Sequence, residues 1–118
     1  MSVACVTFPE ERHEIGALAL AVRLATLGCR VTYLGADLPV EDLCNFLRLR
    51  NPTWICVSVV MPLSKEKLAY YAGRLRQCAG QKTNVAIGGA GLPAVLPTVS
   101  GVHFIRDFYH LDVTVSLS

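Results

Sequence analysis

The stretch WICVSVV at residues 54–60 decides how the rest of the chain is interpreted, because only a serine interrupts its run of apolar residues. A strand with one face in water alternates apolar and polar residues, whereas a parallel strand covered on both faces is apolar almost throughout. We therefore expect residues 54–60 to form the central strand of a parallel sheet.

Strand-like runs and helical stretches alternate on both sides of this segment. We expect strands over 3–8, 30–34, 54–60, 83–87 and 102–105, and helices over 15–27, 39–50, 64–79 and, as a short one, 93–98. Strands joined through helices form right-handed crossovers. The sequence thus predicts one α/β domain over residues 1–118, a flavodoxin-like (Rossmann-like) three-layer sandwich whose five-stranded parallel sheet has the order 2-1-3-4-5. The tail, 106–118, is ambiguous between helix and irregular structure.

Composition excludes several classes of protein. The 118 residues are 53% hydrophobic and 17% charged, with a net charge of +2, which is too apolar for a disordered chain. The basic residues are scattered, so we expect no direct nucleic-acid binding by this segment. No apolar run approaches the ~18–20 residues of a membrane span. No secretory signal is visible, and we expect a cytoplasmic protein.

Five cysteines are present, at positions 5, 29, 44, 56 and 78. Their number is odd, no two have the spacing C-x-x-C, and most lie inside apolar runs. We therefore expect reduced core residues, with neither a disulfide framework nor a zinc knuckle.

Ligands of this fold bind beyond the carboxyl ends of the strands, near the switch between strands 1 and 3. The loop that follows the first strand there contains ERHEIG at residues 11–16. Two interpretations of His13 are open: a solvated surface histidine, or a metal ligand. For the second, the positive end of the following helix keeps the ring neutral, Glu11 can accept the proton of the other ring nitrogen, and Gly16 leaves room for a large group.

Two further loops at this edge allow two interpretations each. Residues 89–94 match G-x-G-x-x-A but follow the fourth strand instead of the first, so they form either a simple turn or a place where a flat group meets the backbone. The Ser58 hydroxyl either bonds the backbone or points to the ligand edge. A phosphoacceptor receiver is excluded, because no Asp follows the third strand and Arg106 stands where a Lys would close the fifth. His103 and His110 have no recognisable partners, and no nucleophile with a base is identifiable.

Taken together, Glu11-x-His13-x-x-Gly16, Ser58-x-Val60 and Gly88-Gly89 resemble the cobalamin-binding domain family, whose pattern is D-x-H-x-x-G, S-x-L and G-G. The resemblance extends from residue 3 to about residue 105 and includes LGADLP at 34–39. Glu and Val replace the usual Asp and Leu at positions 11 and 60. The Glu form is most similar to CarH-type light-sensing transcriptional repressors and related antirepressors.

This resemblance implies cobalamin bound base-off, His-on, with His13 as the lower axial ligand of cobalt and Glu11 as its partner. Ser58 would bond the displaced nucleotide tail in a slot. The resemblance implies that the slot is lined by Val60 and Met61 and has Gly88, Gly89 and Ala90 at its floor. It also implies contacts to the lower face of the corrin from Arg12, Glu14, Ile15 and Gly16.

The function implied is a sensor, a non-enzymatic photoreceptor or cofactor-sensing module in transcription regulation, loaded with adenosylcobalamin, methylcobalamin or hydroxocobalamin. Two alternatives stay open: a corrinoid subunit of a methyltransferase or adenosylcobalamin mutase, and a haem- or bilin-binding sensor of the same fold. The expected helix over 15–27 is apolar almost all round. We therefore expect its outer side to meet a ligand, a partner or a second copy of the chain. The resemblance also implies a helical cap domain or a protein partner over the upper corrin face.

Overall fold

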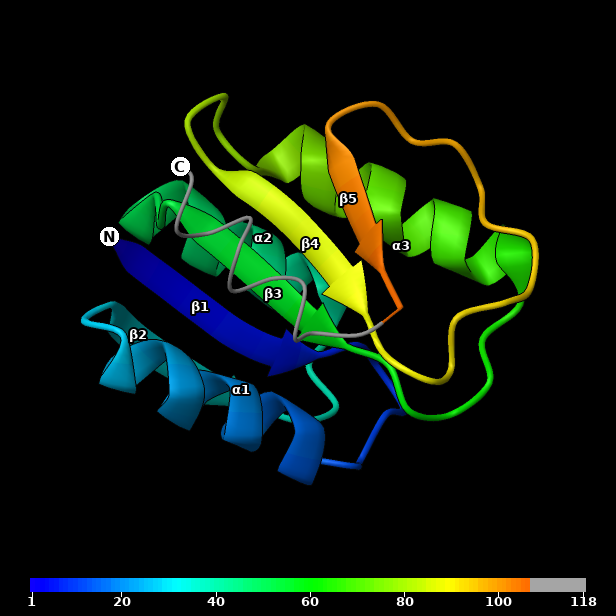
Figure 1. Cartoon of the computed structure of the whole chain (residues 1–118). Coiled ribbons are helices and arrows are strands. Elements are labelled where there is room, and N and C mark those ends of the chain that lie inside the picture. The colour runs from blue at the N-terminus through cyan, green and yellow to red at the C-terminus, as the bar shows by residue number, and fades with distance from the viewer. Residues whose placement is uncertain (107–118) are drawn as a thin grey trace.

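The computed structural model describes residues 1–106 and contains one five-stranded parallel sheet with helices on both faces (Figure 1). The sheet order, β2-β1-β3-β4-β5, confirms the predicted fold class. The strands are β1 (Ser2–Thr7), β2 (Arg30–Gly35), β3 (Trp54–Ser58), β4 (Asn84–Gly88) and β5 (Val102–Ile105). The helices are α1 (Ile15–Thr26), α2 (Val40–Arg50) and α3 (Lys65–Cys78).

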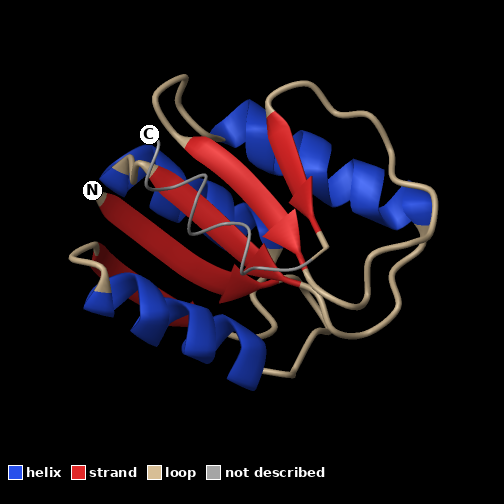
Figure 2. Ribbon diagram, in the orientation of Figure 1, coloured by secondary structure: helices blue, strands red, loops and turns tan. Residues whose placement is uncertain are grey.

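The two faces of β3 belong to two separate cores. Ile55 and Val57 pack with residues of α2 and α3, whereas Trp54 and Cys56 pack with residues of α1. Figure 2 shows the resulting layers, with α1 on one side of the sheet and the other two helices opposite. Because all five residues of β3 are buried, the continuous apolar run has the physical cause that was expected for it.

The helix ends follow from local chemistry. The Ser64 hydroxyl accepts a hydrogen bond from the backbone N–H of Lys67 at 3.1 Å and so caps α3. Gly28, just beyond α1, has a φ of +93°, a left-handed conformation that glycine adopts without strain.

The helix expected over residues 93–98 is not formed, and this prediction was wrong. The segment is an irregular part of the connection from β4 to β5. Pro97 has no N–H to donate and disfavours a helical conformation at the residue before it. The Arg106 guanidinium instead donates to the carbonyls of Pro93 and Ala94, at 3.0 and 2.9 Å. Residues 107–118, including most of the ambiguous tail and His110, lie outside the described residues.

The prediction of five reduced cysteines was also wrong. Cys44 in α2 and Cys78 in α3 form a disulfide, while Cys5, Cys29 and Cys56 are free thiols. The two bonded cysteines are 34 residues apart in sequence, and only the packing of α2 against α3 brings them together. Spacing along the chain therefore carried no signal for this bond.

Helix α1 is apolar on both sides, as its sequence predicted. Ala17, Leu20 and Leu24 are buried against the sheet, whereas Ile15 and Val22 on the outer side are 83% and 59% exposed.

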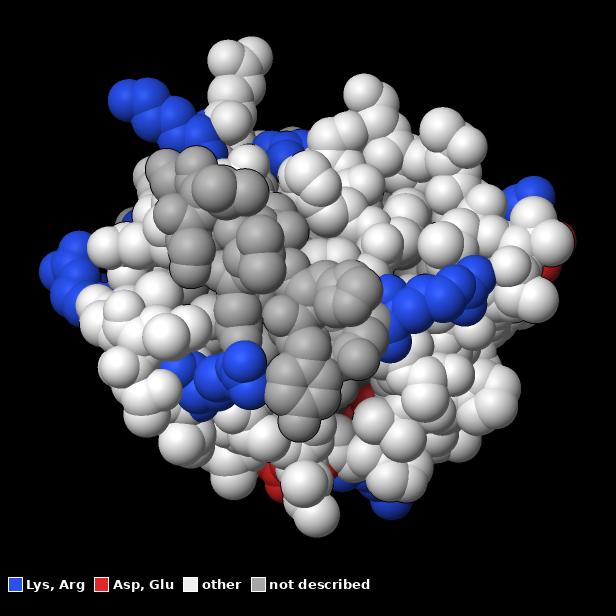
Figure 3. Space-filling model, in the orientation of Figure 1, with Lys and Arg blue, Asp and Glu red and all other residues white. Residues whose placement is uncertain are grey.

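Across residues 1–106, no helix combines the length and apolar character needed to cross a bilayer. On the face in Figure 3, visible Lys and Arg side chains are mostly set apart by uncharged residues.

Candidate functional site

Three loops meet at the carboxyl edge of the sheet, where the strand order switches between β1 and β3 (Figure 1). They are the β1–α1 loop (residues 8–14), the β3–α3 loop (59–64) and the β4–β5 loop (89–101). All the candidate residues lie in these loops, at the carboxyl ends of β3 and β4, or in the first turn of α1.

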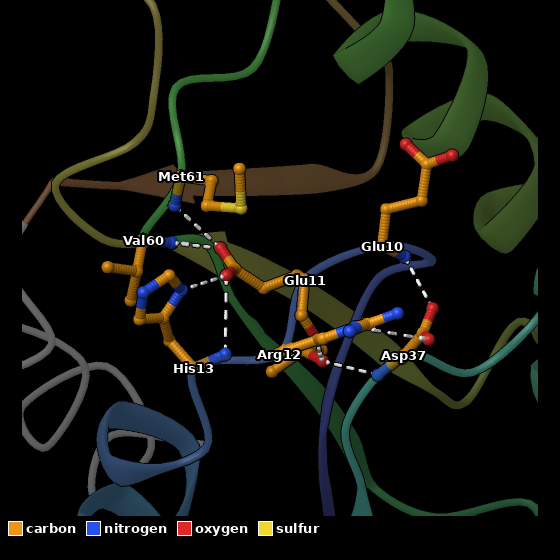
Figure 4. A network of polar contacts seen from close by, with 8 residues as sticks. Glu10, Glu11, Arg12, His13, Asp37, Val60 and Met61 are labelled. Carbon is orange, nitrogen blue, oxygen red and sulfur yellow. Dashed lines mark hydrogen bonds and ion pairs between the residues drawn. The ribbon is translucent and has the colours of Figure 1, made fainter.

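Glu11 is the central residue of the site, and its carboxylate is almost completely buried. One oxygen, Oε1, accepts hydrogen bonds from the backbone N–H groups of Val60 at 2.5 Å and Met61 at 2.7 Å. The other, Oε2, lies 2.7 Å from Nδ1 of His13 (Figure 4). A single side chain thus ties the β1–α1 loop to the β3–α3 loop and also holds the imidazole.

The Glu11 carboxyl is ionised at neutral pH. Burial by itself raises its pKa, but the hydrogen bonds from His13, Met61 and Val60 outweigh that effect and leave the pKa below its ordinary value. An ionised carboxylate can only accept hydrogen bonds, so the neutral imidazole of His13 carries its proton on Nδ1.

In this neutral form of His13, Nε2 is the nitrogen without a proton and has a free lone pair. The side chain is 57% exposed, and no residue between 1 and 106 forms a hydrogen bond with Nε2. Within the same range, no group of three His, Cys, Asp or Glu side chains could hold a bare metal ion. A lone imidazole with a fixed tautomer suits a metal that a macrocycle already holds.

Gly16 lets the first turn of α1 approach the end of β3. A Cβ atom at this position would lie 2.8 Å from Oγ of Ser58. The space where a side chain at position 16 would lie is therefore next to the Ser58 hydroxyl and is not open. Ser58 itself is 3% exposed, and its hydroxyl has no hydrogen-bond partner among residues 1–106. A buried hydroxyl without a partner is rare and points to a group that it bonds only when a ligand is present.

The glycines after β4 are required by close backbone packing. Gly89 has a φ of +130°, and a Cβ there would lie 2.2 Å from the carbonyl oxygen of Val59. At Gly91 the corresponding distance to the carbonyl oxygen of Met61 is 2.3 Å. Val59 donates its backbone N–H to the carbonyl of Gly88 at 2.8 Å. The β3–α3 loop is therefore fixed from both sides, by Glu11 and by the β4–β5 loop.

Small side chains fill the α1 face of the sheet beneath these loops. Thr7, Ser58 and Gly88 are in register across β1, β3 and β4, and the next row on the same face is Cys5, Cys56 and Ala86. On the opposite face the corresponding row is Val6, Val57 and Ile87. The sequence analysis missed Thr7, Cys5, Cys56 and Ala86; the signal was the small residue at every second position of each strand.

The other predicted contact residues in the loops and in the first turn of α1 lie at the surface. Glu14 Oε1 accepts a hydrogen bond from the hydroxyl of Tyr33 at 2.7 Å, which contributes, after burial, to raising the pKa of Tyr33 to about 12. Arg12 is exposed, and its Nε lies 4.0 Å from Oδ2 of Asp37. Ile15, Val60, Met61 and Ala90 are also exposed.

A cavity of about 130 Å³ opens between the β1–α1 and β3–α3 loops. At its rim, Lys67 Nζ lies 3.4 Å from Oε2 of Glu10. Its lining residues are Phe8, Pro9, Glu10, Glu11, Val59, Met61, Pro62, Leu63, Ser64 and Lys67. The sequence analysis did not predict this cavity.

Comparison with known proteins gives consistent results. A model of the B12 binding domain family matches residues 1–103. The HTH-type transcriptional repressor CarH of Myxococcus xanthus is 42% identical over 88 residues, which are 75% of this chain and 29% of that protein. The chain therefore spans less than a third of the length of this relative.

Two solved structures share the fold. A cobalamin-binding protein from Desulfitobacterium hafniense has a TM-score of 0.74 at 20% identity, and the monomethylamine corrinoid protein of Methanosarcina barkeri has 0.70 at 17%. Each match covers 98% of this chain and 57% of the other.

Proposed function

The chain belongs to the B12-binding domain family, and from this premise we propose that it binds cobalamin base-off with His13 as the lower axial ligand of cobalt. The observation that carries the proposal is the geometry of the imidazole. Glu11 fixes the proton on Nδ1, and the Nε2 lone pair is left at the exposed edge of the sheet.

The residues present fit this cofactor. Because the corrin ring already supplies four nitrogen ligands to cobalt, the protein needs to add only one donor, and the site offers one. Ile15, 83% exposed just after His13, supplies apolar surface for the lower face of the ring. Arg12, Glu14 and Gly16 complete the proposed corrin contacts. When bound, the cofactor would supply a cobalt–carbon bond that light can break.

The displaced nucleotide tail is assigned to the α1 face of the sheet. The buried hydroxyl of Ser58, which has no hydrogen-bond partner in the described part of the chain, would donate to it. The side chains in the rows across β1, β3 and β4 are small, and we propose that a flat aromatic base lies against them. Val60, Met61 and the Gly88-Gly89-Ala90 segment would border this slot. A haem or a bilin has no such tail, so these features favour cobalamin over the haem or bilin alternative.

We assign the domain to a sensor in transcription regulation, in the cytoplasm, and not to an enzyme. Its relation to a transcriptional repressor, at 42% identity, supports this role. The likeness to a corrinoid protein is at the level of the fold and does not favour a methyltransferase or mutase subunit. A helical cap domain, a protein partner or a second copy of the chain is expected to cover the upper corrin face.

The test mixes the purified chain with adenosylcobalamin in the dark and then illuminates it. We expect binding with the absorption spectrum of a nitrogen-ligated, base-off cofactor, and a change in spectrum and in oligomeric state after illumination. In His13→Ala the nitrogen ligation should disappear. Wild-type spectra in that variant would remove His13 from the site. Binding that illumination leaves unchanged would favour a corrinoid subunit, and a Soret band without cobalamin uptake would favour haem.

A further inference from the structure

The β2–α2 loop (residues 36–39) braces the β1–α1 loop through Asp37. Oδ1 of Asp37 accepts a hydrogen bond from the backbone N–H of Glu10 at 2.5 Å. The N–H of Asp37 is shared between the Thr7 hydroxyl oxygen at 2.9 Å and the Glu11 carbonyl at 3.1 Å. The Thr7 hydroxyl in turn donates to the same carbonyl at 2.7 Å. All these bonds end on residues 7–11, the segment that presents the Glu11 carboxylate.

The backbone at this contact adopts a conformation that it would not keep alone. Glu10 and Asp37 have φ angles of +70° and +55°. Such conformations are unfavourable for residues with a side chain and persist where surrounding contacts enforce them. The two residues face each other and are joined by the Glu10 N–H to Asp37 Oδ1 bond. This hydrogen bond therefore stabilises the unusual turn that leads into Glu11.

The turn determines where the imidazole lies. With its carbonyl fixed by Thr7 and Asp37, Glu11 can extend its side chain across to the β3–α3 loop and place Oε2 beside Nδ1 of His13. We propose that Asp37 is a positioning residue, which acts through Glu11 to fix the tautomer and orientation of His13. The part of this proposal that concerns cobalt rests on the proposed function; the part that concerns the ring does not.

The role of Asp37 depends on the hydrogen bond that its Oδ1 accepts from the Glu10 N–H, and not on the negative charge of its carboxylate. The only cation near the Asp37 carboxylate, among residues 1–106, is the Arg12 guanidinium, 4.0 Å away. The two side chains are 45% and 86% exposed, and such pairs contribute little. Asparagine keeps the acceptor oxygen and tolerates a positive φ, whereas glycine tolerates the φ but has no acceptor.

The first experiment uses the cofactor-free chain, labelled with ¹⁵N, and reads the ring nitrogens by NMR at about pH 9, where an ordinary imidazole is neutral. In wild type and Asp37→Asn we expect His13 almost wholly as the Nδ1–H tautomer. In Asp37→Gly and Asp37→Ala its ratio to the other tautomer should fall roughly tenfold. His103, which packs on Trp54 away from this loop, is the internal control.

A second experiment reads the ligand directly in ¹⁵N-labelled protein loaded with cob(II)alamin. An axial ¹⁵N from the protein splits each cobalt line of the electron paramagnetic resonance spectrum into a doublet, whereas the unlabelled nucleotide base gives a triplet. We expect the full doublet in wild type and Asp37→Asn, and a clearly smaller share of it in the Gly variant.

The outcomes separate the two proposals. A Gly variant that matches wild type in both experiments would show that only the backbone conformation at position 37 matters, and would overturn the positioning role. A wild type without the doublet would overturn His13 ligation, while the tautomer ratios in the cofactor-free chain would still decide the role of Asp37. Melting curves of Asp37→Gly and Asp37→Asn confirm that folded proteins are compared.

Discussion

Glu11→Gln changes the site by one atom, an oxygen to a nitrogen, and is expected to abolish nitrogen ligation without unfolding the chain. The amide oxygen can still accept from the backbone N–H groups of Val60 and Met61, as Oε1 does now. The amide NH₂ then faces Nδ1 of His13 and can only donate to it. The neutral ring must therefore move its proton to Nε2, the atom that is proposed to bind cobalt.

The magnitudes follow from these contacts. A hydrogen bond to a carboxylate contributes about 1.5–3 kcal/mol and a neutral one about 0.5–1.5, so two backbone bonds to the amide cost roughly 2 kcal/mol in unfolding free energy. Loss of the 2.7 Å contact between Nδ1 and Oε2 removes the preference for the competent tautomer. Loss of such a partner typically weakens metal affinity by about 10–100-fold.

The assay is a titration with methylcobalamin in the dark, followed by absorption, alongside urea unfolding of the free protein. Glu10→Gln is the matched control. It makes the same charge change one residue away, but the Glu10 side chain pairs with Lys67 and not with His13. We expect Glu10→Gln to bind with wild-type affinity and Glu11→Gln to bind at least about tenfold more weakly, without nitrogen ligation. If Glu11→Gln bound normally and kept the nitrogen-ligated spectrum, the tautomer argument would be refuted.

Three further predictions concern stability and thiol chemistry. Gly89→Ala should lower the free energy of unfolding by about 2–4 kcal/mol, because the φ of Gly89 is +130° and the new Cβ overlaps the Val59 carbonyl. In the control Gly73→Ala, where no atom lies within 4 Å of the new Cβ, the free energy of unfolding should rise by about 0.5–1 kcal/mol. Equal urea midpoints for the two variants would contradict this prediction. Reduction of the disulfide between Cys44 and Cys78 should lower the free energy of unfolding by about 3–4 kcal/mol, given their sequence separation of 34. Urea unfolding with and without dithiothreitol measures this loss. Alkylation of all five cysteines without reductant would show that the bond is absent. In the native protein, iodoacetamide should label the half-buried Cys29 before Cys5. Burial, and then the nearby Cys29, raise the pKa of Cys5 to about 12, so that Cys5 has little of the reactive thiolate form. Mass spectrometry of the labelled peptides checks the order.

The sheet could be predicted because each strand carries its own local signal. The apolar run at 54–60 fixed the central position, although the strand itself ends at Ser58. Val59 and Val60 had the composition of a strand, and the Val59 N–H still bonds the carbonyl of Gly88, but the Val60 N–H bonds the Glu11 carboxylate instead of continuing the ladder. The sequence could not show this, because the bond to Glu11 spans 49 residues.

The site could be predicted only where its residues are close in sequence. Glu11 and His13 are two positions apart, so their pairing could be inferred from spacing and from the family resemblance. Asp37 lies 27 residues from Glu10, and its role depends on two positive φ angles that nothing in the sequence announces. The disulfide is the same kind of case: it depends on α2 and α3 packing side by side, which no local pattern records.

The crossing of the loops has a consequence for protein engineering. Residues 59–61 are held on one side by a carboxylate of the β1–α1 loop and on the other by a backbone that only glycine allows. Grafting the histidine loop alone onto another parallel-sheet scaffold would transfer the donor atom without the atoms that aim it. A transplant needs all three segments at once, together with the neighbouring strand end that supplies Asp37.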